Sequence, residues 1–296
     1  MGRLEGRASM IRTGFIGLGT QGKPIAAHLA PAGFETTVYD ILDAPVKELV
    51  RGGAEAAGSP RELGTRADII GICVPEDQHL QAVMRGENGL LAGAAEGTLV
   101  LVHSTVQPET VVTLADEASA KGIRVVDACV SGGVRGASSK QLTYMVGARA
   151  EELEDAQPYF AATTEKEVLY AEGIGNGCRL KLALNIITFI EWAAAFESVQ
   201  LAFASGLPVE LLEKAGLSNG QLTPMMLEFV QILKWSAEQV RSEESQTFLR
   251  ENMFLAEKDL TLALALGRKS QISMPVAGLV AQQMARIYQV EDEGRR

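Results

Sequence analysis

Three absences limit what this 296-residue sequence can be. Its cysteines, Cys73, Cys129 and Cys178, are far apart and form no CxxC pair, which argues against a disulfide scaffold and a cysteine-rich zinc site. No uninterrupted apolar run approaches the roughly 18 residues that a membrane helix needs, so we predict no membrane partner. The histidines at positions 28, 79 and 103 have no partner at metal-ligand spacing. We therefore predict no metal site.

Basic residues are also scarce, with 27 Lys and Arg against 37 Asp and Glu and a formal net charge of −10. This balance argues against nucleic acid as a partner, because sequence-independent binding relies on many Lys and Arg contacts to phosphate. A small anionic substrate is compatible with it, since a site can be locally basic on an acidic protein. The first ten residues contain no apolar run of the kind found in signal peptides. We expect a cytoplasmic protein in which residues 1–10 form a disordered extension.

Short β-branched runs alternate with helix-length patterns through the first half of the chain. This alternation predicts crossover units and a mainly parallel, doubly wound Rossmann sheet, with the carboxyl ends of its strands along one edge. The expected strands are residues 11–16, 36–39, 68–74, 98–102, 123–126, 142–146 and 168–170, and a helix is expected over 20–32.

The pattern changes after Gly177, where strand signals are nearly absent. Residues 180–204 contain no Gly or Pro and are rich in Leu, Ala and Ile, which predicts one long helix. Further helices are expected over 211–215, 225–240, 248–266 and 276–288. The predicted fold class is α/β, in which a Rossmann domain over residues 11–174 is followed by an all-α domain over residues 175–296.

A glycine-rich loop leads from the first strand toward the following helix with the GxGxxG spacing of dinucleotide-binding loops. The first glycine permits a tight turn, the second lets the backbone approach a pyrophosphate, and the third permits close packing of helix on strand. The second strand ends at Tyr39 and Asp40, where a carboxylate can accept hydrogen bonds from the adenosine ribose and repel a 2′-phosphate. NAD is therefore predicted in preference to NADP. The loop consists of Gly17, Leu18, Gly19, Thr20, Gln21 and Gly22.

Further segments, together with this loop, carry a resemblance to a known family. They are Asp127-Ala128-Cys129-Val130-Ser131-Gly132-Gly133, Gly175-Asn176-Gly177 with Lys181 and Asn185, Lys258-Asp259-Leu260, and Ser104-Thr105 with Pro108. In this order they resemble the β-hydroxyacid dehydrogenase family, which includes 3-hydroxyisobutyrate dehydrogenase and tartronate semialdehyde reductase. The match spans nearly the whole chain, which makes it far more specific than any single motif.

The resemblance implies an NAD-dependent interconversion of a small β-hydroxy acid and its semialdehyde or keto acid. Lys181 matches the family's general acid/base, which protonates the developing alkoxide during carbonyl reduction. Asn185 lies four residues further along the expected helix, on the same face, and matches a residue that holds the substrate. Because family members assemble through the helical domain, the resemblance also implies a homodimer or homotetramer.

The remaining site residues implied by the resemblance surround the substrate and the cofactor. Two glycines let backbone N–H groups converge on an anion, which suits a segment that binds the substrate carboxylate. That segment is Ser131, Gly132 and Gly133. Residues expected beside the cofactor are Val74, Pro75, Ser104, Thr105 and Lys258, the last of which matches a family lysine near the substrate as well.

Alternatives remain open at this point. A semialdehyde or glyoxylate reductase of the same family would use the same mechanism, and a non-catalytic member would bind NAD without turnover. The site residues also have structural interpretations: Lys181 as a lysine that extends to solvent, Asn185 as a helix-packing amide, residues 131–133 as a plain turn, and Lys258 with Asp259 as an exposed charged pair.

Several residues depart from the pattern that the family usually shows, among them Leu184, which stands where a second Asn often precedes the one matched by Asn185. Gln21 stands in the glycine loop where a Met is typical, and Cys129 replaces the Pro before the Val-Ser-Gly-Gly segment. Lys140 replaces a Gly shortly after that segment. None of them removes a residue assigned to chemistry, so the departures concern the identity of the substrate.

Overall fold

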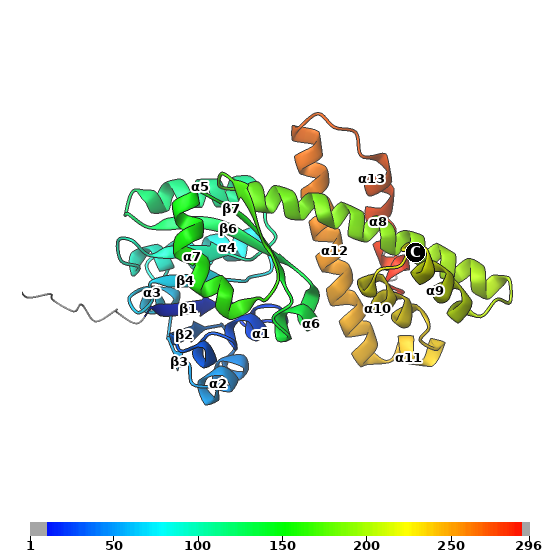
Figure 1. Cartoon of the computed structure of the whole chain (residues 1–296), viewed down its shortest axis with the longest axis horizontal. Helices are drawn as coiled ribbons and strands as arrows, with labels where there is room; N and C mark the ends of the chain where they lie inside the picture. Colours follow the sequence, from blue (N-terminus) through cyan, green and yellow to red (C-terminus); the bar gives the residue numbers. More distant parts are fainter. Residues whose placement is uncertain (1–10, 292–296) are drawn as a thin grey trace, which may run out of the picture. The chain divides into compact units, whose positions relative to one another are not determined.

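The computed structural model describes residues 11–291, which form two compact units divided between Lys181 and Leu182 (Figure 1). The extension expected over residues 1–10 lies outside the described residues. All strands belong to the first unit, and the described part of the second unit contains helices only. The elements are β1 (Arg12–Ile16), α1 (Gly22–Ala26), η1 (Ala30–Ala32), β2 (Glu35–Tyr39), α2 (Asp43–Arg51), β3 (Glu55–Ala56), α3 (Pro60–Gly64), β4 (Ile69–Ile72), α4 (Asp77–Met84), η2 (Leu90–Ala92), β5 (Leu99–Val102), α5 (Pro108–Ser119), β6 (Arg124–Ser131), α6 (Gly133–Ser138), β7 (Thr143–Ala148), α7 (Ala150–Thr163), β8 (Val168–Glu172), α8 (Asn176–Ala204), α9 (Val209–Ser218), α10 (Pro224–Leu233), α11 (Ala237–Arg241), α12 (Glu243–Lys269), α13 (Pro275–Ala281) and α14 (Met284–Ile287).

The first unit is built on one eight-stranded sheet in the order β3-β2-β1-β4-β5-β6-β7-β8. Neighbouring strands are parallel except β6 and β7, so the mainly parallel, doubly wound sheet predicted from the sequence is confirmed. The short strand β3 was not expected, and β6 continues to Ser131 instead of ending at residue 126. The extension arises because Asp127 to Ser131 pair with β7, which overrides the weak strand propensity of Ala128.

The central strands are buried along their whole length, as their continuous apolar sequences require. Ile69–Ile72 and Leu99–Val102 are all classed as buried, which is typical of parallel strands covered by helices on both faces. Gly71 in β4 has a specific reason to be glycine. A β-carbon there would lie 2.4 Å from the hydroxyl oxygen of Tyr159 and 2.9 Å from Nε2 of His103.

His103 follows β5 and is enclosed in this core. Its Nδ1–H donates to the carbonyl oxygen of Ala128 at 2.8 Å, and Nε2 accepts from the hydroxyl of Tyr159 at 2.8 Å. Its ring also stacks on Phe15 and Tyr159, with centroid separations of 5.8 and 5.7 Å. Burial lowers the pKa of His103 to about 4, although the hydrogen bond to Ala128 opposes that shift.

This shift predicts an acid-dependent loss of stability. The unfolded chain binds a proton at His103 below about pH 6.5, whereas the folded protein binds it only below about pH 4. The stabilisation is therefore complete above pH 6.5 and decreases as the pH falls toward 4, by about 3 kcal/mol in all. Urea unfolding of the wild type and of His103→Gln across this range should show a flatter dependence in the variant. Identical slopes would contradict the prediction.

Residues 225–240, expected as one helix, are two in the structure. α10 ends at Leu233, and α11 begins with Ser236 as its N-cap. The Ser236 hydroxyl accepts from the Gln239 N–H at 3.2 Å, and the Gln239 side chain accepts from the Ser236 N–H at 2.8 Å. The capping box starts a new helix at Ser236, inside a stretch whose apolar periodicity predicts one continuous helix. Its Ser and Gln, three residues apart, can be recognised in the sequence. The helix expected over 276–288 is likewise divided, into α13 and α14.

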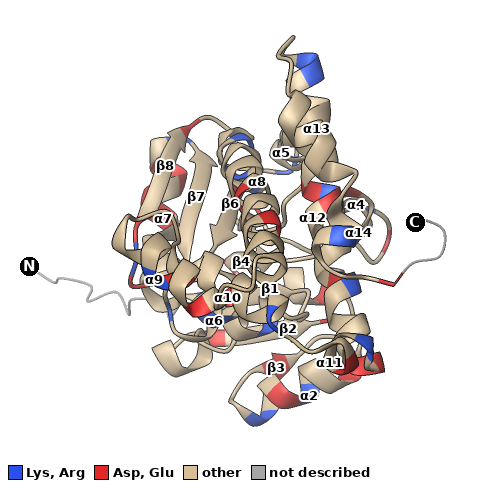
Figure 2. Ribbon diagram, turned by 90° about the vertical axis from the view of Figure 1, so that its right-hand side faces the viewer, with Lys and Arg blue, Asp and Glu red and all other residues tan. Residues whose placement is uncertain are grey.

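The ends of α12 carry charges that suit the helix dipole. Glu243 and Glu244 occupy its first turn, and Arg268 and Lys269 occupy its last. Figure 2 shows the acidic residues of the described ribbon in red and the basic residues in blue. Acidic groups near an N-terminus and basic groups near a C-terminus are favourable. Ser242 completes the start of the helix, since its hydroxyl accepts from the Ser245 N–H at 3.2 Å.

Helix α8 is the longest in the described residues, with 29 residues and a mean hydropathy of 1.4 in its most apolar window. By length and composition alone it is long and apolar enough to cross a membrane. One such helix is weak evidence, because the core helix of a soluble protein passes the same test. Lys181, Asn185, Glu191 and Glu197 interrupt its apolar sequence.

The division between the two units falls within α8. The sequence analysis predicts the domain boundary between residues 174 and 175, just before this helix, whereas the structure divides after Lys181. The carboxylate of Asp127 in β6 accepts the N–H groups of Gly175 and Cys178, each at 2.6 Å. These bonds attach the first turn of α8 to the sheet, so the helix contributes to both units.

Candidate active site

The ends of four neighbouring strands lie level with one another. Ile16 pairs with Tyr39 and with Ile72, and Ile72 pairs in turn with Val102. Because these strands are parallel, the segments that follow them lie along one edge of the sheet, where doubly wound proteins bind their ligands. The segments at this edge are residues 17–22, 40–42, 73–75 and 103–105.

The three glycines of the loop have different reasons to be glycine. Gly17 has φ +90°, and a β-carbon there would lie 2.1 Å from the carbonyl oxygen of Cys73. At Gly22 a β-carbon would lie 2.0 Å from the carbonyl oxygen of Gly17. At Gly19, which is exposed, a β-carbon would meet nothing within 4 Å. The protein itself requires glycine at the first and third positions, whereas the open second position fits the close approach of a ligand such as a pyrophosphate.

The helix after this loop is shorter than expected. A helix was predicted over residues 20–32, but α1 covers only Gly22–Ala26 and is followed by turns and by η1. Pro31 explains the break, because it has no N–H for the carbonyl of Ala27 and its ring would collide with that group. The chain instead makes shorter-range bonds, such as His28 N–H to Ile25 O at 3.2 Å.

Asp40 holds the glycine loop against the end of β2. Its Oδ2 accepts the N–H of Leu18 at 2.5 Å, and its Oδ1 accepts the N–H of Leu42 at 2.8 Å. The carbonyl oxygen of Tyr39 accepts the Gly17 N–H at 3.1 Å. Leu18 is buried at 2% exposure, so only its backbone is available to a cofactor. Ile41 and Leu42 are exposed, and they place apolar side chains beside the carboxylate.

Ser104 also has a partner within the protein. Its hydroxyl oxygen accepts the N–H of Val74 at 2.7 Å, and the side chain is buried at 3% exposure. The bond ties the segment after β4 to the segment after β5. Ser104 thus acts on the candidate cofactor edge through Val74, while Pro75 is exposed and Thr105 is half-buried.

The Ser131-Gly132-Gly133 segment lies beside the glycine loop. Gly132 and Gly133 have φ +129° and +61°, and Gly133 begins α6, so the segment is a strand-to-helix turn that favours glycine at both positions. Nε2 of Gln21 donates to the carbonyl oxygen of Gly133 at 3.5 Å. Nε2 of His28 lies 2.8 Å from the carbonyl oxygen of Ala137 in α6. The predicted carboxylate-binding segment and the predicted cofactor loop are therefore neighbours.

Two further departures from the family pattern, Cys129 and Lys140, lie in different environments. Cys129 is fully buried, and its Sγ lies 3.5 Å from Sγ of Cys178 and 3.5 Å from the carbonyl oxygen of Ser104. Lys140 has φ +55°, a conformation that costs a residue with a β-carbon about 1–2 kcal/mol. A Gly at that position would adopt it without strain. Cys129 is therefore a core residue, whereas Lys140 holds a backbone conformation that favours glycine.

Lys181 lies half-buried on α8, one turn beyond the residues that Asp127 holds. Asn185 follows four residues later, so the two side chains share a helix face as predicted. Asn185 is buried at 6% exposure, and its Nδ2 donates to Oδ2 of Asp259 at 2.5 Å.

Lys258 and Asp259 of α12 form a pair that is not exposed. Nζ of Lys258 lies 3.0 Å from Oδ1 of Asp259, and the two side chains are 18% and 10% exposed. Asp259 therefore joins Lys258 to Asn185, although the sequence analysis assigns it no role of its own. The motif Lys258-Asp259-Leu260 pointed to this position, but its bond to Asn185 spans 74 residues and has no local signature.

Asp127 is the second residue that sequence reasoning left without a role. It is fully buried, and burial raises the pKa of its carboxyl above the ordinary value although backbone N–H groups oppose the shift. The described residues contain no group of three or more His, Cys, Asp or Glu that could hold a metal ion.

Comparisons with known proteins agree with this geometry. A family model for the NAD binding domain of 6-phosphogluconate dehydrogenase matches residues 12–173. An uncharacterized oxidoreductase of Mycobacterium tuberculosis (strain ATCC 25618 / H37Rv) is 36% identical over 274 residues, which cover 93% of this chain and 92% of that protein. A solved structure of 3-hydroxyisobutyrate dehydrogenase from Salmonella typhimurium shares the fold, with a TM-score of 0.81 at 22% identity over 93% of each chain.

Two relatives with named activities match over a shorter span. The NAD-dependent L-serine dehydrogenase of Pseudomonas aeruginosa is 37% identical over 65% of this chain and 64% of that enzyme. The 3-hydroxyisobutyrate dehydrogenase of the same organism is 35% identical over 63% of this chain and 62% of that enzyme. The fold and the family model define an oxidoreductase with an NAD(P)-binding Rossmann domain. The chain belongs to the β-hydroxyacid dehydrogenase family, as its motifs predicted.

Proposed function

We propose that this protein oxidises the hydroxymethyl group of a small 2-substituted 3-hydroxypropanoate to the semialdehyde, reversibly and with NAD. The observation that carries this proposal is the hydrogen bond from Gln21 in the glycine loop to the carbonyl oxygen of Gly133 in the Ser131-Gly132-Gly133 turn. This contact supports the assignment of residues 131–133 as the carboxylate-binding segment, because the turn then lies beside the proposed cofactor loop. The same strand, β6, holds the start of the helix that carries Lys181.

The substrate class comes from the chemistry shared by the named relatives. L-Serine and 3-hydroxyisobutyrate both carry a hydroxymethyl group on the carbon that bears the carboxylate, and they differ only in an amino or a methyl substituent. A site for such substrates needs an anion-binding turn, an acid/base near the hydroxyl and a nicotinamide. We assign the first role to Ser131, Gly132 and Gly133, whose backbone N–H groups and hydroxyl are donors.

Lys181 is assigned the proton transfer. In reduction its ammonium group donates a proton to the carbonyl oxygen and stabilises the negative charge that develops there. In oxidation the neutral amine accepts the hydroxyl proton. Asn185 cannot titrate, so its role is to orient the substrate. NAD, when bound, supplies or accepts the hydride.

NAD is proposed over NADP because of the charge at the end of β2. The carboxylate of Asp40 is fixed by two backbone N–H groups at the position expected for the adenosine ribose. A 2′-phosphate there would meet like charge, and the next two residues, Ile41 and Leu42, supply no cation.

The test is a steady-state assay that follows reduced nicotinamide absorbance with NAD and with NADP. Substrates are 3-hydroxyisobutyrate, L-serine and glycerate, and the controls are lactate and 4-hydroxybutyrate, in which the hydroxyl is one carbon nearer to or farther from the carboxylate. We expect the highest kcat/KM for a 3-hydroxy acid with NAD. A preference for either control substrate would refute the substrate class, and a preference for NADP would refute the cofactor assignment.

The same assay separates the two alternatives. Reduction of a semialdehyde or glyoxylate, with no measurable oxidation of any 3-hydroxy acid, would identify a reductase. NAD binding measured by calorimetry without turnover in either direction would identify a non-catalytic member of the family.

A further inference from the structure

Asp127 occupies an unusual position for a carboxylate. It lies on β6, an interior strand of the sheet, level with Val102 of β5 and Gly147 of β7, and its side chain is fully buried. Oδ1 accepts the Gly175 N–H and Oδ2 accepts the Cys178 N–H, both at 2.6 Å. Both oxygens are thus committed to the start of α8, whose dipole favours an anion at this end.

Two glycines bring the helix close enough for these bonds. A β-carbon at Gly177 would lie 2.4 Å from the carbonyl oxygen of Met145 and 2.8 Å from the nitrogen of Gly147. A β-carbon at Gly147 would lie 2.4 Å from Oδ1 of Asp127 and 2.7 Å from the nitrogen of Gly177. The backbone of the first helical turn therefore rests directly on β7, and any side chain at either glycine would push it away.

Lys181 follows this anchored turn without an intervening loop. It lies four residues after Gly177 and four before Asn185, so all three positions share one helix face. A continuous helix is stiff over one turn. The placement of the first turn on the sheet therefore determines the placement of the Lys181 side chain relative to the first unit.

We propose that Asp127 is a positioning residue for the proton transfer by Lys181, and that it acts by fixing the first turn of α8 on β6 and β7. The inference rests on the proposed function of Lys181. It assigns the Gly175-Asn176-Gly177 segment to helix placement, because Gly175 and Gly177 contact Asp127 and β7.

The hydrogen bonds of Asp127 support a role beyond packing. Burial raises the pKa of its carboxyl, and the N–H groups of Gly175 and Cys178 oppose that shift because they stabilise the ionised form. Its two carboxylate oxygens accept the N–H groups of Gly175 and Cys178 at the helix start. The carboxylate provides two acceptor oxygens for the N–H groups of Gly175 and Cys178, and an amide provides only one.

Asp127→Asn tests the proposal. The amide leaves one helix N–H facing an N–H donor, so the first turn must move. A displacement on the order of 1 Å at a reacting group lowers turnover by about 10²-fold, and we expect a fall in kcat of about 10- to 100-fold. The affinity for NAD, measured by calorimetry, should be little changed because the glycine loop is untouched. Expressing kcat per NAD-binding site removes the contribution of unfolded protein.

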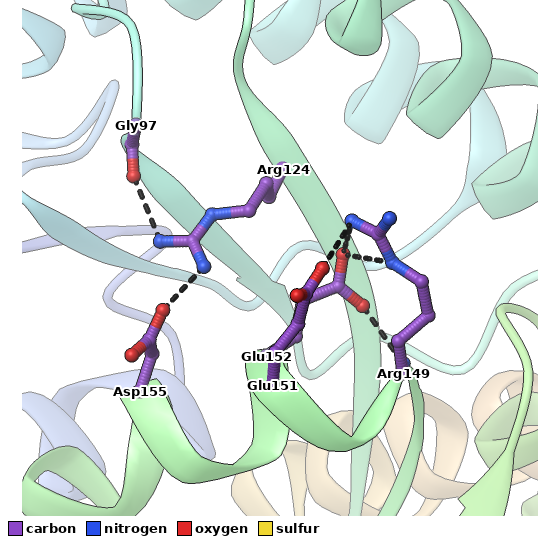
Figure 3. Close-up of polar contacts among 6 residues, drawn as sticks. All are labelled: Gly97, Arg124, Arg149, Glu151, Glu152 and Asp155. Carbon is purple, nitrogen blue, oxygen red and sulfur yellow. Dashed lines mark hydrogen bonds and ion pairs between the residues drawn. The ribbon is translucent and has the colours of Figure 1, made fainter.

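Glu152 provides a matched control in the same unit. It is also a buried carboxylate at a helix start, where its Oε2 accepts the Arg149 N–H at 2.8 Å and its Oε1 accepts from the Arg149 guanidinium (Figure 3). Glu152→Gln should change thermal stability and leave kcat per NAD site at the wild-type value. An equal fall of kcat in both variants would show a general effect of lost stability and overturn the proposal.

Gly177→Ala keeps the carboxylate and moves the helix. Its β-carbon overlaps Met145 O and Gly147 N, so kcat should fall as in Asp127→Asn, again with NAD affinity retained. This variant decides the question if Asp127→Asn does not fold. Unchanged kcat in either folded variant would overturn the positioning role. If Lys181→Ala retains activity, the proposed function itself fails, which is a different outcome.

Discussion

Lys181→Ala should lower kcat by about 10²- to 10⁴-fold, the usual contribution of a general acid/base. The physical reason is that hydride transfer to a carbonyl leaves an alkoxide that needs both a proton and stabilisation of its charge. Water is a poor substitute for a positioned ammonium group. NAD affinity should persist, because the Gly17–Gly22 loop and Asp40 keep their contacts. Steady-state kinetics and calorimetry measure the two quantities separately.

Lys181→Arg separates proton transfer from charge. Arginine keeps the positive charge but does not deprotonate in proteins, so it cannot act as the base in oxidation. We expect it to be nearly as inactive as Lys181→Ala in oxidation. Recovery of activity would show that the charge alone suffices and that Lys181 is not the acid/base.

Arg179→Ala is the matched control on the same helix. Its guanidinium donates to Oδ1 of Asn176 at 2.9 Å and lies 3.9 Å from Glu109, and its side chain points to another helix face than Lys181. Loss of this cation should leave kcat at the wild-type level. A comparable fall would attribute the effect of Lys181→Ala to damage of α8.

The edge that carries the cofactor loop could be predicted from sequence because its signals are local. The spacing of Gly17, Gly19 and Gly22 after a β-branched run, and an acidic residue about 20 positions later, need only one strand–turn–helix unit. Lys181 and Asn185 could be placed on one face from their spacing alone. The structure adds that Gly17 and Gly22 are required by the backbone of the protein, whereas Gly19 is not.

The residues that were missed make contacts over long sequence separations. Asp127 bonds to Gly175 and Cys178 across 48 and 51 residues, and Asp259 bonds to Asn185 across 74. The periodicity of apolar residues along the sequence does not indicate such long-range hydrogen bonds. The antiparallel β6–β7 pair was equally invisible, since the strand propensity of Ala128 is weak and the partner strand sets its extent.

In two places the sequence also contains a local signal for the end or the start of a helix, although the apolar periodicity predicts one continuous helix there. Pro31 lies inside the helical pattern of residues 20–32, and the ring of a proline is incompatible with the carbonyl four residues before it. Ser236 and Gln239 have the spacing of a capping box inside the apolar pattern of residues 225–240. In both cases the periodic pattern extended across a residue that ends or begins a helix.

Gly17→Ala should remove NAD binding and destabilise the first unit. A β-carbon at φ +90° costs about 1–2 kcal/mol, and it would lie 2.1 Å from the carbonyl oxygen of Cys73, a backbone atom that a side-chain rotation cannot relieve. Overpacking of this kind adds about 1–3 kcal/mol, so the free energy of unfolding should fall by about 2–5 kcal/mol. Urea unfolding measures that loss.

Gly19→Ala is the informative counterpart to Gly17→Ala. A β-carbon at Gly19 meets no protein atom within 4 Å, so the free energy of unfolding should stay at the wild-type value. NAD affinity should nevertheless fall, because the methyl group occupies the space through which a pyrophosphate approaches the backbone. Wild-type NAD affinity in Gly19→Ala would show that the cofactor does not lie against the loop. A loss of stability in this variant equal to that of Gly17→Ala would show that the loop needs both glycines for folding alone.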